Sequence, residues 1–370
     1  MIGGRGVKGK QLHNRADSPR QPGSTIKPIG SYGPALQMSY EYAKDSKKMK
    51  LDNSDGSDWG DYITASSVIN DSPVKNRGKA WPKNWYSGYK GQMTLRHAVQ
   101  QSVNTCSVKT FNQIGADYSV SMLKKCGVTS IQEKGDANDL NAAALALGGM
   151  TNGISPLEVT AAYAVFPNGG VYKTPIAYTK VLNSNDEVLF EKTAEEEQVY
   201  DEGVAFIMTD ILRTVVTEGI GKRAAIGSQP VGGKTGTTSD SYDLWFSGFT
   251  PQYTAAVWMG NDINIKLSGG SGSCASLWSS MMSRICKDLP RGSFKEKPSN
   301  VTSVNGEYYV EGTYSKTSLS RTGGSGDGSD ASSVVENTTE RITQATQATQ
   351  TQPTHTQPSH TQPTQPSSAN

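Results

Sequence analysis

A serine and two lysines of this chain stand in a spacing that suits acyl-transfer chemistry. Ser24 precedes Lys27 by three residues, so their side chains share one face if the segment is helical. A serine hydroxyl is a weak nucleophile until a base takes its proton, and none of the four histidines stands in a context suited to that role. Lys27 can be that base if burial or a nearby cation, such as Lys234, lowers its pKa.

Two later motifs complete the pattern. Their residues are Ser102 and Asn104 in Ser-x-Asn, and Lys234, Thr235, Gly236 and Thr237 in Lys-Thr-Gly-Thr. Ser-x-x-Lys followed in order by these motifs is the constellation of enzymes that acylate themselves on serine. Each motif alone has a structural explanation: a helix cap, a polar helix terminus and a bulged edge strand. The ordered set favours chemistry, and the glycines of the third segment favour a substrate peptide lying along a strand there.

The charge balance argues against one class of partner. The chain has 370 residues, with 36 Lys plus Arg against 34 Asp plus Glu, and no basic run is interleaved with aromatic residues. A nucleic acid is therefore not expected to bind. No apolar run reaches the ~20 residues of a membrane-spanning helix, and the first residues lack the apolar region of an export signal.

The four cysteines show neither Cys-x-x-Cys pairs nor a histidine at metal-ligand spacing. This argues against a zinc site, and the sequence implies no metal or other cofactor. Free buried thiols are one reading, and a bridge between Cys274 and Cys286 is the other. Both stay open.

Hydrophobic periodicity and turn residues predict a sheet covered by helices. Strands are expected over 231–238, 243–250 and 254–260 as an antiparallel meander, helices over 94–101, 141–147, 156–166, 203–217 and 275–289, and a hairpin over 178–190. Residues 45–92 indicate a long surface excursion with short strands. The Ser/Thr/Gln/Pro-rich tail over 325–370 is predicted to be disordered.

The chain resembles the transpeptidase domain of class A penicillin-binding proteins. The residues that carry the resemblance are Arg20-Gln21-Pro22-Gly23-Ser24-Thr25-Ile26-Lys27-Pro28, Trp81-Pro82-Lys83-Asn84, Thr94-Leu95-Arg96, Asp243-Leu244-Trp245-Phe246-Ser247-Gly248 and Val257-Trp258-Met259-Gly260. Ile2-Gly3-Gly4-Arg5 and Asn14-Arg15-Ala16 are similar to the segment ahead of the family's nucleophile. The resemblance covers residues 1–290, which leaves a polar linker over 291–324 before the tail.

The resemblance implies an α+β penicilloyl serine transferase fold like that of β-lactamases, with an antiparallel sheet sandwiched by helices and a largely helical second lobe. It implies a D,D-transpeptidase that cross-links peptidoglycan stem peptides through an acyl-enzyme on Ser24 and that β-lactams acylate. The implied roles are base for Lys27, proton shuttle for Ser102, amide partner for Asn104, and recognition of the substrate carboxylate by Lys234, Thr235 and Thr237. Gly236 is expected to bind substrate together with Thr235 and Thr237. The amides of Ser24 and Thr237 would form the oxyanion hole.

The resemblance also implies a cellular setting. Class A members carry a membrane anchor and a glycosyltransferase domain ahead of this domain, and the chain begins shortly before Ser24. We therefore expect a fragment whose parent is membrane-anchored on the extracytoplasmic face of the bacterial cell membrane.

Three other functions share these motifs. A serine β-lactamase needs a glutamate that positions the deacylating water, and no Glu-x-x-x-Asn segment of that kind is present. A D-Ala-D-Ala carboxypeptidase differs in that water rather than an amine resolves the acyl-enzyme. A non-catalytic penicillin-sensing or wall-binding module would keep every motif residue.

Overall fold

A computed structural model describes residues 14–76 and 78–314 of the chain. The segment Ile2-Gly3-Gly4-Arg5 and the predicted disordered tail over 325–370 lie outside the described residues. Within the described part, no helix is both long enough and apolar enough to cross a membrane.

Three strands form the sheet that carries the Lys-Thr-Gly-Thr motif. They are β9 (Gly232–Thr237), β10 (Asp243–Phe249) and β11 (Thr254–Gly260), antiparallel in the order β11-β10-β9. A short 3-10 turn, η4 (Ser239–Ser241), joins the first two. Each strand ends within one residue of the predicted meander, which is thereby confirmed.

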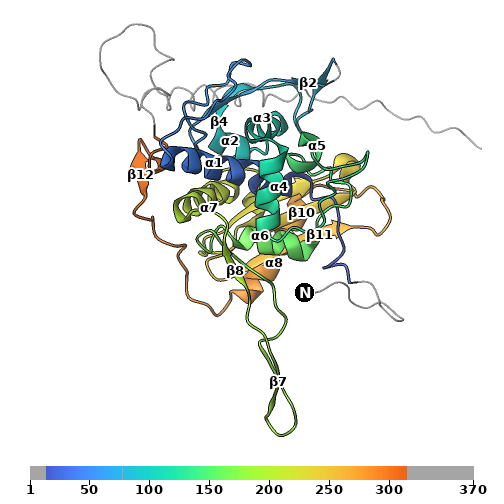
Figure 1. The fold of residues 1–370 in the computed structure, drawn as a ribbon. Helices are drawn as coiled ribbons and strands as arrows, with labels where there is room; N and C mark the ends of the chain where they lie inside the picture. The colour runs from blue at the N-terminus through green and yellow to red at the C-terminus, as the bar shows by residue number, and fades with distance from the viewer. Residues whose placement is uncertain (1–13, 77, 315–370) are drawn as a thin grey trace, which may run out of the picture. The chain divides into compact units, whose positions relative to one another are not determined.

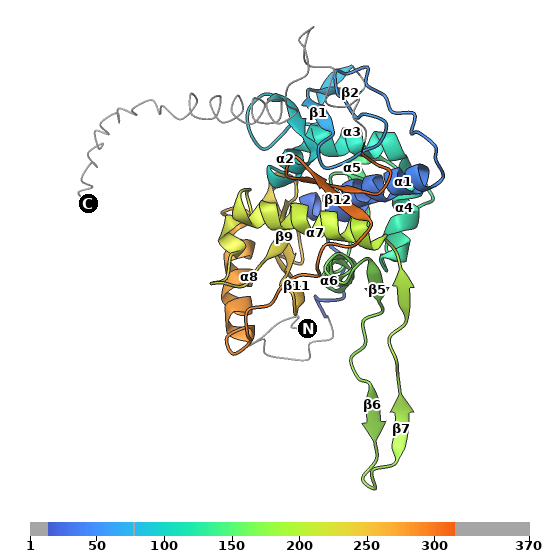
Figure 2. The same ribbon diagram turned by 90° about the vertical axis from the view of Figure 1, so that its left-hand side faces the viewer.

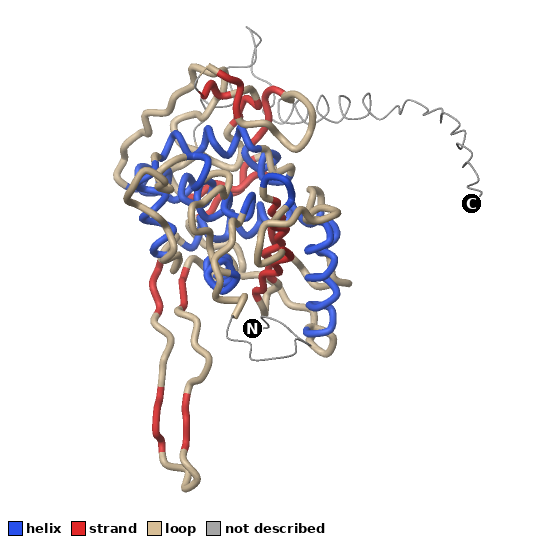
Figure 3. Tube along the Cα trace, turned by 90° about the vertical axis from the view of Figure 1, so that its right-hand side faces the viewer, coloured by secondary structure: helices blue, strands red, loops and turns tan. Residues whose placement is uncertain are grey.

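Helices cover both faces of this sheet. They are α6 (Pro156–Ala164), α7 (Glu202–Thr217) and α8 (Gly272–Ile285), with the 3-10 turn η3 (Lys222–Ala224) after α7. Figure 2 shows α8 and α6 on opposite sides of the strands, and Figure 3 shows the same layers from the other side. Phe246 packs on Trp278 of α8, with ring centroids 5.2 Å apart. Its neighbour Trp245 faces the other layer, as alternation along a strand requires, and donates to the carbonyl of Gln21 at 2.9 Å.

A helical lobe adjoins the sheet (Figure 1). Its helices are α1 (Gly33–Lys44), α2 (Leu95–Gln100), α3 (Asn104–Ile114), α4 (Ala116–Lys125) and α5 (Ala142–Leu145). Short antiparallel pairs occupy the predicted excursion: β1 (Val68–Asp71) with β4 (Gly91–Thr94), and β2 (Val74–Asn76) with β3 (Lys79–Trp81). The sandwiched sheet and the helical lobe confirm the predicted α+β fold.

Local capping signals placed two helices correctly. The Thr94 hydroxyl accepts from the backbone N–H of His97 at 3.2 Å at the start of α2. Ser155 and Glu158 form the predicted reciprocal capping box at the start of α6.

A two-stranded arm extends from the sheet side of the molecule (Figure 2). It consists of β5 (Val171–Lys173) with β8 (Glu196–Gln198) and β6 (Lys180–Leu182) with β7 (Val188–Glu191). The predicted hairpin over 178–190 forms its outer part. At its turn Asp186 has φ +63, a conformation that Asp tolerates better than most residues.

Residues 301–310 do not form the polar linker that the sequence analysis assigned to 291–324. They form a hairpin, β12 (Val301–Val304) with β13 (Glu307–Val310). Its turn residues Asn305 and Gly306 have φ +50 and +79, as a two-residue type I′ turn requires. Arg96 holds the hairpin against α2 and α7, because it pairs with Glu307 at 2.5 Å and with Asp210 at 2.8 Å.

All four cysteines are free and buried. A bridge between Cys274 and Cys286 is not formed, because both belong to the α8 segment and lie twelve residues apart along its axis. That separation corresponds to about 18 Å, far beyond the reach of a disulfide.

Candidate active site

Ser24 lies in a tight turn between the two lobes. The turn is the 3-10 segment η1 (Gly23–Ile26), followed by the π-helical segment η2 (Pro28–Tyr32), which leads into α1. The Thr25 hydroxyl donates to the carbonyl of Pro22 at 2.7 Å and closes the turn. Ser24 is half-buried and faces a pocket of about 820 Å³.

Glycines allow backbone to pack on both sides of this turn. Gly23 has φ +51, and a Cβ there would lie 2.6 Å from the carbonyl oxygen of Thr237. A Cβ at Gly148 would lie 2.2 Å from the carbonyl oxygen of Gly23. The nucleophile turn is therefore held between strand β9 and the loop after α5, with no space for side chains at these contacts.

Gly236 is not among the residues that line the pocket, and its predicted place in substrate binding stays a prediction. A Cβ at this position would lie 2.5 Å from the carbonyl oxygen of Pro22 and 2.8 Å from Thr25 Cγ2. The close approach expected beside this glycine comes from the nucleophile turn itself. Thr235 and Thr237, its neighbours in β9, do line the pocket.

Lys27 is fully buried and makes three hydrogen bonds. Its Nζ donates to the backbone carbonyl of Ser102 at 2.8 Å, to Ser102 Oγ at 3.4 Å and to Asn104 Oδ1 at 2.6 Å. Burial lowers the pKa of Lys27 well below its usual 10.5, and the nearby Lys234 cation lowers it further. Both causes act in the direction that the sequence-based hypothesis of a lysine base requires.

Ser102 Oγ lies between the two lysines. Lys234 Nζ donates to it at 2.7 Å and also to the carbonyl of Thr235 at 3.1 Å. Ser102 has φ +54, a conformation that costs a non-glycine residue free energy and that clusters at functional sites. The second motif therefore serves to bring one hydroxyl within reach of both lysines.

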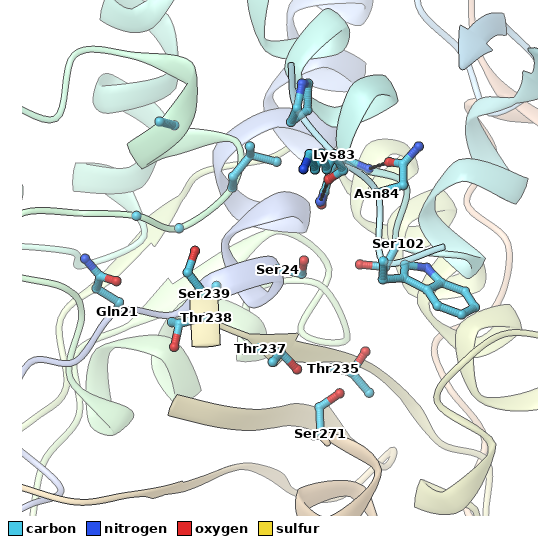
Figure 4. Close-up of a pocket in the computed structure, with 18 of the residues that line it drawn as sticks. Gln21, Ser24, Lys83, Asn84, Ser102, Thr235, Thr237, Thr238, Ser239 and Ser271 are labelled. Atoms are coloured by element: carbon cyan, nitrogen blue, oxygen red, sulfur yellow. Dashed lines mark hydrogen bonds between the residues drawn. The ribbon is translucent and has the colours of Figure 1, made fainter. Parts of the chain in front are cut away.

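Ser24 Oγ itself makes no hydrogen bond to any of the described residues. Figure 4 shows Ser24, Ser102, Thr235 and Thr237 around one space, contributed by the nucleophile turn, the α2–α3 junction and β9. Hydrogen bonds of catalytic groups are often formed only when substrate is present. The nucleophile is thus free to meet a carbonyl that enters this pocket.

Burial of Lys234 makes stability depend on pH. Burial lowers its pKa from 10.5 to about 7, so between these values the unfolded chain binds a proton that the folded chain does not. Stability therefore rises with pH through that window, by at most about 1.4 kcal/mol per pH unit for one lysine. Below the window the lysine is protonated in both states and adds no pH dependence. Urea unfolding near about pH 7 and about pH 8.5 should show the parent gaining stability relative to Lys234→Met. Equal changes in the two proteins would contradict the lowered pKa.

Arg20 anchors the segment that leads into the nucleophile turn. Its Nε pairs with Asp243 Oδ1 at 2.8 Å, and its guanidinium lies 5.4 Å from the ring centroid of Trp258. Its backbone pairs with Ile154. Arg20 and Asp243 both belong to motifs of the resemblance, but no local pattern indicates that their side chains meet.

Asn84 is a pocket residue to which the sequence analysis assigned no role. Its Oδ1 accepts from the backbone N–H of Asn104 at 2.9 Å, and the carbonyl of Lys83 accepts from Asn104 Nδ2 at 2.7 Å. The Trp-Pro-Lys-Asn segment was noted only as part of the resemblance. Figure 4 shows Lys83 and Asn84 side by side at the pocket.

Comparisons with known proteins agree on one family. The family described as "Penicillin binding protein transpeptidase domain" matches residues 60–273, a range that includes Ser102, Asn104 and Lys234 and begins after Ser24. Penicillin-binding protein 1A of Clostridium acetobutylicum is 34% identical over 360 residues, covering 94% of this chain and 40% of the relative. Penicillin-binding protein 1A of Clostridium botulinum is 36% identical over 318 residues, covering 82% and 35%. The chain thus spans well under half of these relatives.

A solved structure shows the same fold. PonA1 of Mycobacterium tuberculosis in complex with penicillin V matches with a TM-score of 0.66 and 21% identity, covering 84% of this chain and 78% of that one. At this identity the likeness concerns the arrangement of helices and strands.

Proposed function

The chain belongs to the penicillin-binding protein transpeptidase family, and from that premise we propose that it is a serine D,D-transpeptidase whose nucleophile is Ser24. One observation carries the proposal: Ser102 Oγ is hydrogen-bonded to two buried lysines at the pocket that Ser24 faces. This arrangement gives a serine-acylating enzyme its base and a route for the proton without any histidine.

The first half-reaction follows from these contacts. Ser24 Oγ attacks the carbonyl of the penultimate D-alanine of a stem peptide, and neutral Lys27 accepts the hydroxyl proton. Ser102 Oγ relays a proton to the departing amine, and free D-alanine leaves. Asn104 holds the Lys27 amine by its Oδ1 at 2.6 Å and is expected to meet the substrate amide. An amine of a second stem peptide then attacks the acyl-enzyme and forms the cross-link.

The substrate carboxylate has suitable partners along β9. Lys234 is buried and carries a positive charge when it is protonated, and Thr235 and Thr237 add hydroxyls at the pocket. The turn at Gly23 packs directly on the backbone of Thr237, which brings the amides of Ser24 and Thr237 to one side of the pocket. Two convergent N–H groups are what an oxyanion hole needs. A β-lactam presents the same carboxylate and carbonyl.

The lining of the pocket favours a long-lived acyl-enzyme. Among the described residues that line it there is no aspartate or glutamate. Hydrolysis of an acyl-serine by the class A β-lactamase route needs a carboxylate that activates water. The β-lactamase alternative is therefore disfavoured, whereas the carboxypeptidase alternative, with water competing for the acyl-enzyme, is not.

The setting of the reaction follows from its substrate. Peptidoglycan is assembled outside the cytoplasm, so we place the proposed activity on the extracytoplasmic face of the bacterial membrane. The proposed partners are stem peptides and β-lactams, and no contact with nucleic acid is expected.

A fluorescent penicillin tests the proposal. We expect one covalent label per chain, which peptide mass mapping assigns to Ser24 and which persists after free penicillin is removed. Loss of the label within seconds would indicate a β-lactamase, and absence of labelling would contradict the proposal.

A D-Ala-D-Ala peptide then separates the remaining functions. D-alanine release that forms a longer peptide when an acceptor amine is added indicates a transpeptidase. Release with water as the sole acceptor indicates a carboxypeptidase. Labelling without any release of D-alanine indicates a penicillin-sensing module.

A further inference from the structure

Asp71 is a buried carboxylate at the end of β1, behind the active site. It is 1% exposed and accepts hydrogen bonds from four groups. The donors are Asn84 Nδ2 at 2.8 Å, the Tyr86 hydroxyl at 2.5 Å, the backbone N–H of Lys90 at 2.8 Å and the Thr105 hydroxyl. All four donors are uncharged. A buried carboxylate is tolerated when its oxygens accept enough hydrogen bonds. The carboxylate of Asp71 therefore holds its four donor groups in fixed positions.

These donors belong to two elements that meet at the pocket. Thr105 lies in the first turn of α3, and the other three lie in the loop that follows β3. Most side chains of that loop are exposed, and Trp85 is 63% exposed. Hydrogen bonds, rather than apolar burial, therefore fix this loop against α3.

Asn84 connects Asp71 to the first turn of α3 by hydrogen bonds. The residue before α3 is Val103, whose side chain cannot cap the helix. Asn84 supplies the missing acceptor from 20 residues away, because its Oδ1 accepts the backbone N–H of Asn104 at 2.9 Å. Its Nδ2 is held by Asp71, so the carboxamide of Asn84 has one possible orientation.

Asn104 in turn connects the loop after β3 to Lys27 by hydrogen bonds. The carbonyl of Lys83 accepts from Asn104 Nδ2 at 2.7 Å, and Asn104 Oδ1 accepts from Lys27 Nζ at 2.6 Å. Because Nδ2 is committed to the loop, Oδ1 must face the lysine. Both the backbone and the side chain of Asn104 are thus set by two consecutive loop residues.

We propose that Asp71 is a positioning residue for the acylation of Ser24: through Asn84 and Asn104 it holds the amine of Lys27 in its working place. The inference rests on the proposed function, since it assigns a role in that reaction. Asp71 touches neither the substrate pocket nor Lys27 and acts only through the groups it orders.

Three variants test the proposal. Asp71→Asn replaces one acceptor by a donor while keeping the shape. The double variant Asp71→Asn with Asn84→Asp restores the hydrogen bond between the two positions with the donor and acceptor exchanged. The carboxylate at position 84 can still accept the backbone N–H of Asn104. Asp55→Asn is the matched control, because Asp55 pairs with Lys109 in the same lobe and has no contact with Asn84 or Asn104.

The second-order rate of labelling by fluorescent penicillin is the first readout. We expect Asp71→Asn to slow it by about 10- to 100-fold, as misplacement of catalytic groups does. The double variant should recover most of the loss, and Asp55→Asn should keep the parent rate even where its melting temperature falls. Parent-like labelling in Asp71→Asn, or no recovery in the double variant, would overturn the proposal.

Hydrogen exchange of the Asn104 amide is a second readout that does not depend on activity. It should be faster in Asp71→Asn than in Asp55→Asn, and slow again in the double variant. If the parent chain is not labelled at all, the proposed function fails and the role of Asp71 in catalysis fails with it. Exchange then still decides whether Asp71 orders Asn104, so the two failures are distinguishable.

Discussion

Replacing Lys27 by methionine is expected to slow acylation of Ser24 by about 10²- to 10⁴-fold, the usual contribution of a general base. Methionine is apolar and of similar length, so it suits a side chain that is fully buried. The loss would come from the missing proton acceptor near Ser102, not from a collapsed pocket. Stopped-flow labelling with a fluorescent penicillin measures the rate, and circular dichroism shows whether the fold is kept.

An arginine in place of Lys27 tests whether the residue acts as a base or only as a positive charge. Lys27→Arg supplies a permanent positive charge and donors for Ser102 and Asn104, but a guanidinium does not lose its proton in proteins. It should therefore be as slow as Lys27→Met. Acylation of Lys27→Arg at the parent rate would remove the base from the mechanism.

A buried lysine outside the site provides the control for Lys27→Met. Lys109 is 6% exposed and donates to the carbonyl of Asn70 at 2.6 Å. Lys109→Met should lower the melting temperature, because Asp55 loses its partner, but should leave acylation near the parent rate. Equal losses of acylation in Lys27→Met and Lys109→Met would show that acylation depends on any buried lysine of the lobe and not on the position of Lys27 beside Ser102.

The fold could be predicted where the local signals are strong. The turn residues around β10 and the alternating apolar residues define the meander, and the capping residues Thr94 and Ser155 define two helix starts. The hairpin over 301–310 also carries a local signal, Asn305-Gly306, which the polar composition of its surroundings obscured. The positions of the meander and of these two helices thus followed from short-range chemistry.

The site could be predicted only in part. The three-residue spacing of Ser24 and Lys27 could be read from the sequence as one helical turn. Nothing local shows that Ser102 Oγ meets both lysines across 75 and 132 residues. A glycine in a strand indicates a close approach, and beside Gly236 the structure places the carbonyl oxygen of Pro22, 2.5 Å from where a Cβ would lie. Contacts of this kind depend on how the lobes pack, which periodicity does not encode.

The same reasoning applies to Asp71, whose buried charge has no local signature. Its donors lie between 13 and 34 residues away along the chain. A sequence alone shows an aspartate before Ser72 and Pro73, which is ordinary turn chemistry. Only the fold reveals that this carboxylate connects the loop after β3 to the first turn of α3.

Alanine at Gly148 is expected to cause a large loss of stability and to displace the nucleophile turn. Gly148 has φ +82, and a Cβ would lie 2.2 Å from the carbonyl oxygen of Gly23 and 2.5 Å from its nitrogen. Backbone atoms cannot rotate away from the new methyl group as a side chain can, so the methyl group overpacks the contact. The strain of an alanine with positive φ adds to this, and we expect the free energy of unfolding to fall by about 3 kcal/mol or more. Urea unfolding measures the loss.

Gly115→Ala is the matched control for Gly148→Ala, because Gly115 has φ +78 and nothing within 4 Å of an added Cβ. It should lose about 1–3 kcal/mol from backbone strain alone, because φ +78 with ψ +165 is a conformation essentially confined to glycine, and it should keep the parent rate of labelling. Gly148→Ala should also slow labelling by about 100-fold, because the added methyl displaces the turn that carries Ser24 and a shift of ~1 Å has that effect. Similar stability losses in the two variants, with parent-like labelling in both, would mean that the loop after α5 moves aside and does not hold the nucleophile.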